Sequence, residues 1–208
     1  MTPQRRPPSA TGPGPSRRIA RTAAALGLTT LLATVLAACS PLSSEEIPAE
    51  PTEPWVCDGV SRQTIDLILG EGYTVTQLGE WTDLEADPFT CEVNGIHGHV
   101  VVDVTQRPHA TAADEGAQRL EAWRGDGGVQ LENPLGVTGE GYLIGSPGDL
   151  VTAGWVCARR TVEVRLDTVW LDGTRDQQAD ASALLLQLLP YVCGNEIVPG
   201  VDYAPGDD

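Results

Sequence analysis

Hydrophobic residues follow two different periods between Trp55 and Asn195. A helical spacing of apolar positions predicts helices at 61–69, 111–124 and 174–189. Alternation of apolar and polar residues predicts strands at 73–78, 90–93, 97–105, 129–131, 150–157 and 161–170. The order of these elements predicts a single α+β domain, in which an antiparallel sheet is covered by about three helices on one face.

The two-residue period also predicts which strand side chains face the core. In strand 97–105 the residues expected to point inward are Val100, Val102 and Val104, and those expected to point outward are His97, His99 and Asp103. In strand 161–170 the inward set is Val162, Val164, Leu166 and Trp170, and the outward set is Glu163, Arg165 and Asp167. A turn at Asn94-Gly95 is predicted to join strands 90–93 and 97–105.

Capping and turn residues bound the predicted helices. Ser61 is the expected N-cap of the first helix, which Gly70 ends. The second helix is expected to bury Ala113, Ala117, Leu120 and Trp123. Thr174 or Asp176 caps the last helix, which Pro190 and Gly194 end after Leu189. The glycine-rich segment 135–148 is predicted to be a turn region.

The N-terminal segment has the pattern of an export signal. Its first 21 residues hold five arginines and no acidic residue, and an apolar run follows at about 23–38. This run is short for a membrane span of about 20 residues, which favours a signal peptide over residues 1–38. Ser16-Arg17-Arg18 partly resembles a twin-arginine signal, so two export routes are open. The alternative is one uncleaved transmembrane helix.

Small residues precede a cysteine at the end of the apolar run. Leu36-Ala37-Ala38-Cys39 resembles the lipobox of bacterial lipoproteins. The resemblance implies cleavage after Ala38, a diacylglyceryl group on the Cys39 sulfur, and a location on the outer face of the cytoplasmic membrane. The membrane is therefore an expected partner, reached through the lipid anchor.

Charge changes once residues 1–38 are removed. All 29 acidic residues follow Cys39 but only eight of the 13 basic ones do, so the formal net charge of residues 39–208 is −21. Such a charge argues against binding nucleic acid, whose phosphates attract cations. Residues 39–54 are rich in Pro and Glu and are expected to be a tether, whereas 196–208 are expected to be a disordered tail. The domain is thus assigned to 55–195.

Four cysteines remain when Cys39 is assigned to lipid. An even number in an exported domain predicts two disulfides. Four cysteines allow three pairings, and we expect Cys57–Cys91 and Cys157–Cys193, because each closes a local loop within one half of the domain. A zinc site is the alternative, but the chain lacks a C-x-x-C pair.

The layout resembles small actinobacterial surface lipoproteins of an uncharacterised family. The matching motifs are Cys57-Asp58-Gly59-Val60-Ser61, Cys91-Glu92-Val93 and the glycine-rich turn 135–142. The chain is also distantly similar to extracellular sensor domains of actinobacterial Ser/Thr kinases. Neither resemblance implies catalytic residues or a cofactor.

Candidate chemistry in the chain is sparse. His97, His99 and Asp103 are expected on one strand face, where they are weak candidates for a metal site; a solvated polar face is the alternative. His109 is expected on the surface. The segment Gly145-Ser146-Pro147-Gly148 departs from the G-x-S-x-G elbow of hydrolases and predicts a turn. Glu163 and Asp167 are expected to form an exposed ion-pair ladder with Arg165 rather than a glycosidase pair.

These observations favour a lipid-anchored extracytoplasmic protein with a non-catalytic binding or sensor-like domain. Neither an enzyme motif nor a cofactor is predicted, and the ligand, a protein or a small molecule, is unidentified. The alternatives are a structural or interaction protein of the cell envelope, and a metal-binding or hydrolytic enzyme that uses His97 and His99.

Overall fold

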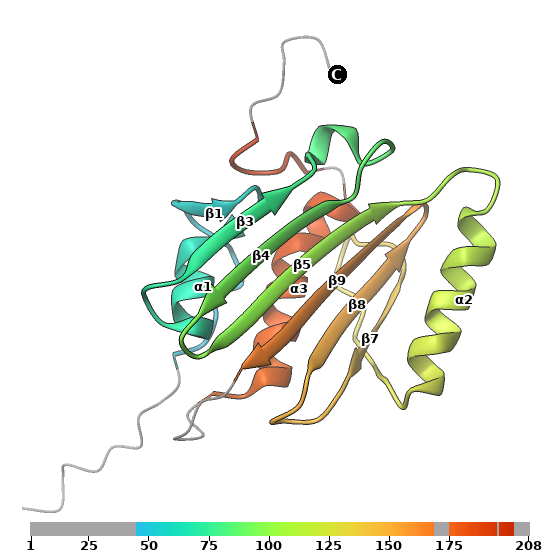
Figure 1. Cartoon of the computed structure of the whole chain (residues 1–208). Coiled ribbons are helices and arrows are strands. Elements are labelled where there is room, and N and C mark those ends of the chain that lie inside the picture. The colour runs from blue at the N-terminus through green and yellow to red at the C-terminus, as the bar shows by residue number, and fades with distance from the viewer. Residues whose placement is uncertain (1–44, 169–174, 195, 202–208) are drawn as a thin grey trace, which may run out of the picture. The chain divides into compact units, whose positions relative to one another are not determined.

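A computed structural model of the chain describes residues 45–168, 175–194 and 196–201, and its main feature is an antiparallel sheet (Figure 1). The helices are α1 (Arg62–Leu69), α2 (Ala112–Gly125) and α3 (Gln177–Val192), with a 3₁₀ turn at Trp81–Asp83. The seven strands are paired in the order β3 (Thr74–Leu78), β4 (Phe89–Gly95), β5 (Gly98–Gln106), β9 (Arg160–Thr168), β8 (Val151–Cys157), β7 (Glu140–Ile144) and β6 (Val129–Gln130). A small separate ribbon joins β1 (Trp55–Cys57) to β2 (Val60–Ser61). The predicted α+β class with one antiparallel sheet is confirmed.

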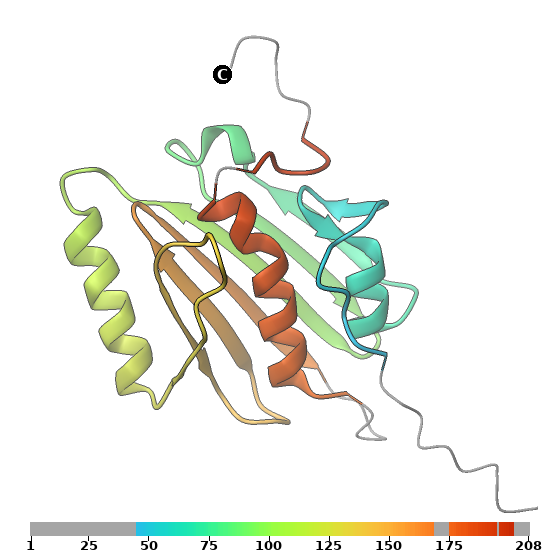
Figure 2. The ribbon, with the colours of Figure 1, turned by 180° about the vertical axis from the view of Figure 1, so that it is seen from behind.

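One sheet face carries the main core. Val100, Val102 and Val104 of β5 lie opposite Leu166, Val164 and Val162 of β9, and all six are fully buried. Figure 2 shows α3 lying across this face with α1 beside it. The leucine-rich side of α3 belongs to the same core, through Leu184, Leu185, Leu188 and Leu189. The predicted inward sets of both central strands are confirmed for the described residues, whereas Trp170 lies outside them.

The second helix, α2, packs against the opposite face of the sheet. Trp123 of α2 contacts Gly154 of β8, where an added Cβ would lie 2.4 Å from the indole ring. Gly154 alternates with Ala153 and Trp155, which face the main core. The helices therefore do not all share one face as expected. The buried side of α2 consists of Ala112, Gly116 and Trp123, whereas Ala113 and Ala117, which were expected to be buried, are exposed. The helix is turned so that Gly116, its smallest residue, lies against the sheet.

Two local predictions in the sheet are wrong. Segment 135–148 contains β7 as well as turns, and Gly141 lies in this strand because the Trp155 ring occupies the space of its Cβ. The β4–β5 turn lies at Ile96-His97, since Gly95 and Gly98 are paired, and not at Asn94-Gly95. Gly98 has a φ of 136° and lies against the Asp167 carbonyl, so the hairpin reverses where only glycine fits.

The last helix begins as predicted but ends later. The Asp176 carboxylate accepts hydrogen bonds from the backbone N–H groups of Gln178 and Ala179, which makes it the N-cap. The other candidate cap, Thr174, lies outside the described residues. Pro190 lies inside α3, which continues to Val192. The Cys193 N–H donates to the Leu189 carbonyl, so the final turn is closed despite the proline.

Two disulfides join Cys57 to Cys91 and Cys157 to Cys193, the pairs expected from the sequence. The first connects the end of β1 to β4, and the second connects the end of β8 to the residue after α3. Each crosslink therefore holds a terminal or helical segment to the sheet.

Both segments that flank the expected domain pack against it. Ile47 lies against the core, and the Pro48 carbonyl accepts a hydrogen bond from the Gln187 side chain of α3 (2.6 Å). Part of the predicted tether, residues 45–54, is therefore bound to the domain. Val198 of the predicted tail is 5% exposed in the core, and the Pro199 carbonyl accepts from the Gly59 N–H (2.8 Å). Ile47 and Val198 lie among the prolines of these segments, and their apolar contacts hold the segments against the domain.

Candidate functional site

The three weak metal candidates do not converge. His97 lies in the β4–β5 turn, with its ring against Gly70 at the end of α1. His99 lies in β5 and not in the turn, and its Nε2 is 3.3 Å from the Glu92 carboxylate. The Asp103 carboxylate accepts from Thr90 (2.7 Å) and pairs with Arg165. Within residues 45–168, 175–194 and 196–201, no group of three or more His, Cys, Asp or Glu side chains could hold a metal ion.

The remaining sequence candidates have structural roles. Ser146 lies in the β7–β8 turn, where its carbonyl accepts from the Asp149 N–H (3.0 Å). On the outer sheet face Glu163 pairs with Arg119 and Arg165 pairs with Asp103, which differs from the ladder expected among Glu163, Arg165 and Asp167. His109 is in an exposed contact with Arg159 (2.7 Å).

A cavity of about 520 Å³ lies between α2 and the outer face of the sheet. One side of α2 forms a wall of it, with residues spaced at helical intervals: Glu115, Gln118, Arg119 and Ala122. The opposite wall comes from the end of β5 and the start of β9, through Thr105, Gln106, Arg107 and Thr161. The lining is therefore mostly polar and contains two arginines.

Arg107 is the distinctive residue of this cavity, because it is only 7% exposed. Among the described residues its guanidinium donates to neutral acceptors: the Thr161 hydroxyl and the carbonyls of Ala158 (3.0 Å) and Arg160 (3.1 Å). Its Nε is buried without a hydrogen-bond partner. Among the described residues, Arg107 forms no ion pair with a carboxylate. Burial lowers the pKa of Arg107, and the charge of Glu115 partly offsets this shift.

The β8–β9 turn positions the acceptors of Arg107. Ala158 and Arg159 form the two-residue loop between the paired residues Cys157 and Arg160. Ala158 adopts a φ of 40°, in the left-handed region that alanine rarely occupies. The Arg107 N–H also donates to the Arg159 carbonyl (2.7 Å), so the backbone and side chain of Arg107 both bind this turn. The guanidinium is thus fixed by the hairpin rather than by a counter-ion.

Gly116 allows α2 to approach the arginine closely. A Cβ on Gly116 would lie 3.1 Å from Val156 and 3.4 Å from the Arg107 guanidinium. A glycine inside a helix costs about 1 kcal/mol relative to alanine. The contact explains why a glycine occupies this position, since a larger residue would move α2 away from the floor of the cavity.

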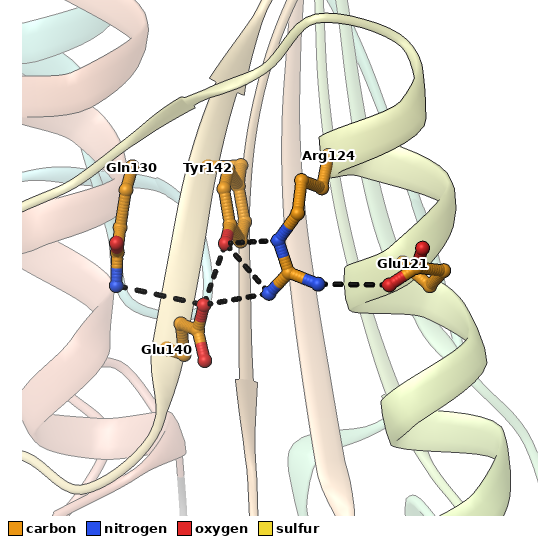
Figure 3. Close-up of polar contacts among 5 residues, drawn as sticks. All are labelled: Glu121, Arg124, Gln130, Glu140 and Tyr142. Carbon is orange, nitrogen blue, oxygen red and sulfur yellow. Dashed lines mark hydrogen bonds and ion pairs between the residues drawn. The ribbon is translucent and has the colours of Figure 1, made fainter.

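A polar cluster fixes the C-terminal end of α2 (Figure 3). Arg124 donates to the Tyr142 hydroxyl from Nε (3.1 Å) and Nη2 (2.9 Å), and Tyr142 donates to the Glu140 carboxylate (2.6 Å). Arg124 also binds Glu121 of its own helix (2.8 Å). The hydrogen bond to Tyr142 raises the pKa of Arg124. The cluster ties α2 to β7 and thereby holds the helical wall of the cavity.

Further arginines surround the site. Arg119 reaches across from α2 to Glu163 of β9 (3.4 Å). Arg160 donates to the Gln106 side chain (3.2 Å) and to the Val192 carbonyl (3.2 Å). Gln106 also lines a second cavity of about 430 Å³, on which Arg159 and Arg160 lie. Four of the eight arginines that follow Cys39 therefore gather at this end of a strongly acidic chain.

No motif or periodic pattern in the sequence marks Arg107 as a residue of the site. One signal was present: residues 104–113 contain no Asp or Glu in a chain that has 29 of them. An arginine in such a stretch has no local counter-ion. Its burial depends on the distant hairpin at Ala158 and on α2, which no local pattern reveals.

Comparison with known proteins adds no relative: no protein-family model, curated protein or solved structure matches the chain. The resemblance to actinobacterial surface lipoproteins stays a prediction. Among the described residues, no helix is both long enough and apolar enough to cross a membrane.

Proposed function

We propose that the chain is a lipid-anchored extracytoplasmic protein whose α+β domain binds a ligand without transforming it. The cavity beneath α2 carries this proposal, because it combines a volume of about 520 Å³ with a buried arginine that forms no ion pair with any described carboxylate. Ligand sites are concave and contain a few fixed polar groups. The hairpin bonds of Arg107 and the Arg124 cluster supply this fixed geometry.

The sequence supports the anchor and the export. The lipobox at 36–39 and the apolar run before it lie outside the described residues, and they imply attachment through Cys39. Two disulfides in the domain agree with an oxidising compartment outside the cytoplasm. The anchor has its own test: intact mass after detergent extraction should show a chain that begins at a diacylated Cys39. A Cys39→Ala variant should lack the lipid mass.

Binding in the cavity is tested by a thermal-shift screen of small polar compounds on the full-length protein. Ala122→Trp fills the cavity from α2, and Ala113→Trp is the matched control, because Ala113 is exposed on the same helix and does not line the cavity. We expect compounds that raise the Tm of the wild type and of Ala113→Trp but not of Ala122→Trp. A screen without any such compound, or equal shifts in both variants, would contradict the proposal.

A further inference from the structure

We infer that the edge of β3 that faces away from β4 binds an extended segment of a cationic partner protein, which adds to the sheet as a further strand. The segment has uncharged β-branched residues flanked by arginine or lysine. β3 does not line the cavity beneath α2, so the inference goes beyond the proposed function. It follows from the backbone of β3, from its side chains and from the charges at its two ends.

The backbone of β3 offers a template for another strand. β3 is the last strand on one side of the seven-stranded sheet (Figure 1) and pairs with β4 over all five of its residues, Thr74–Leu78, without a bulge. Alternate N–H and C=O groups of an antiparallel strand point away from its partner. In the part of the chain that the structure describes, no other segment forms a backbone hydrogen bond with these residues. A row of open donors and acceptors therefore faces away from the sheet.

The side chains of β3 do not protect this edge. Soluble proteins block edge strands with charged residues, prolines, bulges or very short strands. β3 has none of these features, since its sequence is Thr-Val-Thr-Gln-Leu and all five residues are exposed. The opposite edge differs, because β6 is only two residues long. Of the two edges, β3 is the one suited to strand addition, a recurring mode of peptide recognition.

Contacts with the β1–β2 ribbon hold β3 in place. The Gln77 side chain donates to the Asp58 carboxylate (2.8 Å) and accepts from the Asp58 N–H (3.1 Å). Gln77 also lies opposite Cys91, which the first disulfide joins to Cys57. The strand is therefore ordered before a partner arrives, which lowers the entropy cost of binding.

The charges at the ends of β3 favour a cationic segment. Glu71 lies three residues before the strand and Glu80 two residues after it, and both are exposed. Within residues 45–168, 175–194 and 196–201, neither carboxylate forms an ion pair. Arg62 and Asp66 both act on Tyr73 just before the strand, so their charges offset each other. Arginine or lysine on either side of the added strand would pair with the two open carboxylates.

The same charges disfavour a second copy of this chain as the occupant. Two antiparallel β3 strands centred on Thr76 would place Glu80 of one protomer opposite Gly72 of its partner, and thus next to Glu71. Like charges at neighbouring positions of paired strands are destabilising. The formal net charge of −16 adds a general repulsion between copies.

The test adds synthetic peptides to the full-length protein in detergent and follows amide hydrogen exchange by NMR. The probe is a capped peptide of alternating Thr and Val between terminal arginines. One control peptide has glutamates in place of the arginines, and another has a methyl group on every backbone nitrogen. We expect saturable protection of the β3 amides that point away from β4, and no protection of Val129 and Gln130 in β6. The arginine peptide should bind about fivefold or more tightly than the glutamate peptide, and the methylated peptide should not protect β3.

Two variants test the edge itself. Val75→Lys/Leu78→Lys places two charges on β3 and should abolish the protection, because lysines on an edge strand oppose pairing. Val129→Lys/Gln130→Lys is the matched control, since it adds the same charges to the opposite edge, and it should bind the arginine peptide as the wild type does. Equal binding by both variants would show that the peptide does not add to β3.

Two further variants test the charges. Glu71→Gln/Glu80→Gln should remove the preference for arginine over glutamate, whereas Glu132→Gln/Asp149→Asn, at exposed positions elsewhere, should keep it. An unprotected β3, equal binding of the glutamate peptide, or protection that rises with protein concentration alone would overturn the inference; the last result would identify a second copy as the occupant. The wild-type titration decides even where a variant fails to fold. The ligand screen of the cavity is a separate experiment, so failure here leaves the proposed function standing.

Discussion

Arg107 and Arg175 are both buried, but they are compensated in opposite ways. The Arg175 side chain is 7% exposed and binds both oxygens of Asp180 at 2.8 and 2.6 Å. Arg107 is 7% exposed as a whole residue, and its acceptors among the described residues are a hydroxyl and backbone carbonyls. A buried charge requires a partner. The chain supplies a carboxylate partner at the start of α3, whereas no described carboxylate pairs with Arg107 beneath α2.

The largest effect is expected at the compensated arginine. Asp180→Asn should lower the free energy of unfolding by about 3–5 kcal/mol, because it leaves the buried charge of Arg175 without its partner. Urea denaturation with the disulfides intact measures the change. The double variant Arg175→Met/Asp180→Leu should recover most of the loss. Equal losses in the single and double variants would show that the ion pair is not what compensates this arginine.

A smaller effect is expected where α2 meets Arg107. Gly116→Leu should destabilise the protein by about 1–3 kcal/mol, because the side chain would overlap Val156 and the guanidinium. Gly125→Leu is the control, since nothing lies within 4 Å of its Cβ position. The same denaturation assay applies. If both variants lose equal stability, the close approach of α2 to Arg107 has no energetic importance.

Removing the uncompensated arginine should cost less. Arg107→Met is expected to lower the free energy of unfolding by only about 1 kcal/mol, because lost hydrogen bonds are offset by removal of a buried charge. The comparison with Asp180→Asn in one assay sharpens the contrast between the two arginines. A loss as large as that of Asp180→Asn would make Arg107 a structural residue.

The smallest effect, and a stabilising one, is expected in the β8–β9 turn. Ala158→Gly should raise the free energy of unfolding by about 0.5 kcal/mol, since glycine adopts the positive φ without strain but loses more entropy on folding. Ala113→Gly in α2 is the control and should destabilise by about 1 kcal/mol. A loss of stability in Ala158→Gly would show that the turn carries no strain.

Strong periodic patterns made the centre of the fold predictable. Val100, Val102 and Val104 alternate without interruption, and the leucines of α3 leave few positions exposed, so the sheet face and its main helix follow from the sequence. The four cysteines were paired correctly because each pair closes a loop within one half of the domain.

Glycines account for much of what the sequence did not reveal. Gly141 lies in a strand because Trp155 fills the space above it, and Gly116 forms the buried side of α2 because Val156 and Arg107 lie against it. In both cases the reason is a residue that is distant in the sequence. The cavity was equally hidden, since it exists only where α2 crosses the ends of β5 and β9.

The first disulfide would have a mechanical consequence in the lipid-anchored protein proposed above. A pulling force there first loads residues 45–56, which are attached by hydrogen bonds such as Arg62 N–H to the Pro54 carbonyl (2.8 Å) and by the short β1–β2 ribbon. These contacts can detach one after another. At Cys57 the load passes through the covalent bond to Cys91 in β4, a strand paired on both sides within the sheet. Detachment of the N-terminal segment therefore stops at Cys57. The cavity beneath α2 lies further along the chain than this crosslink.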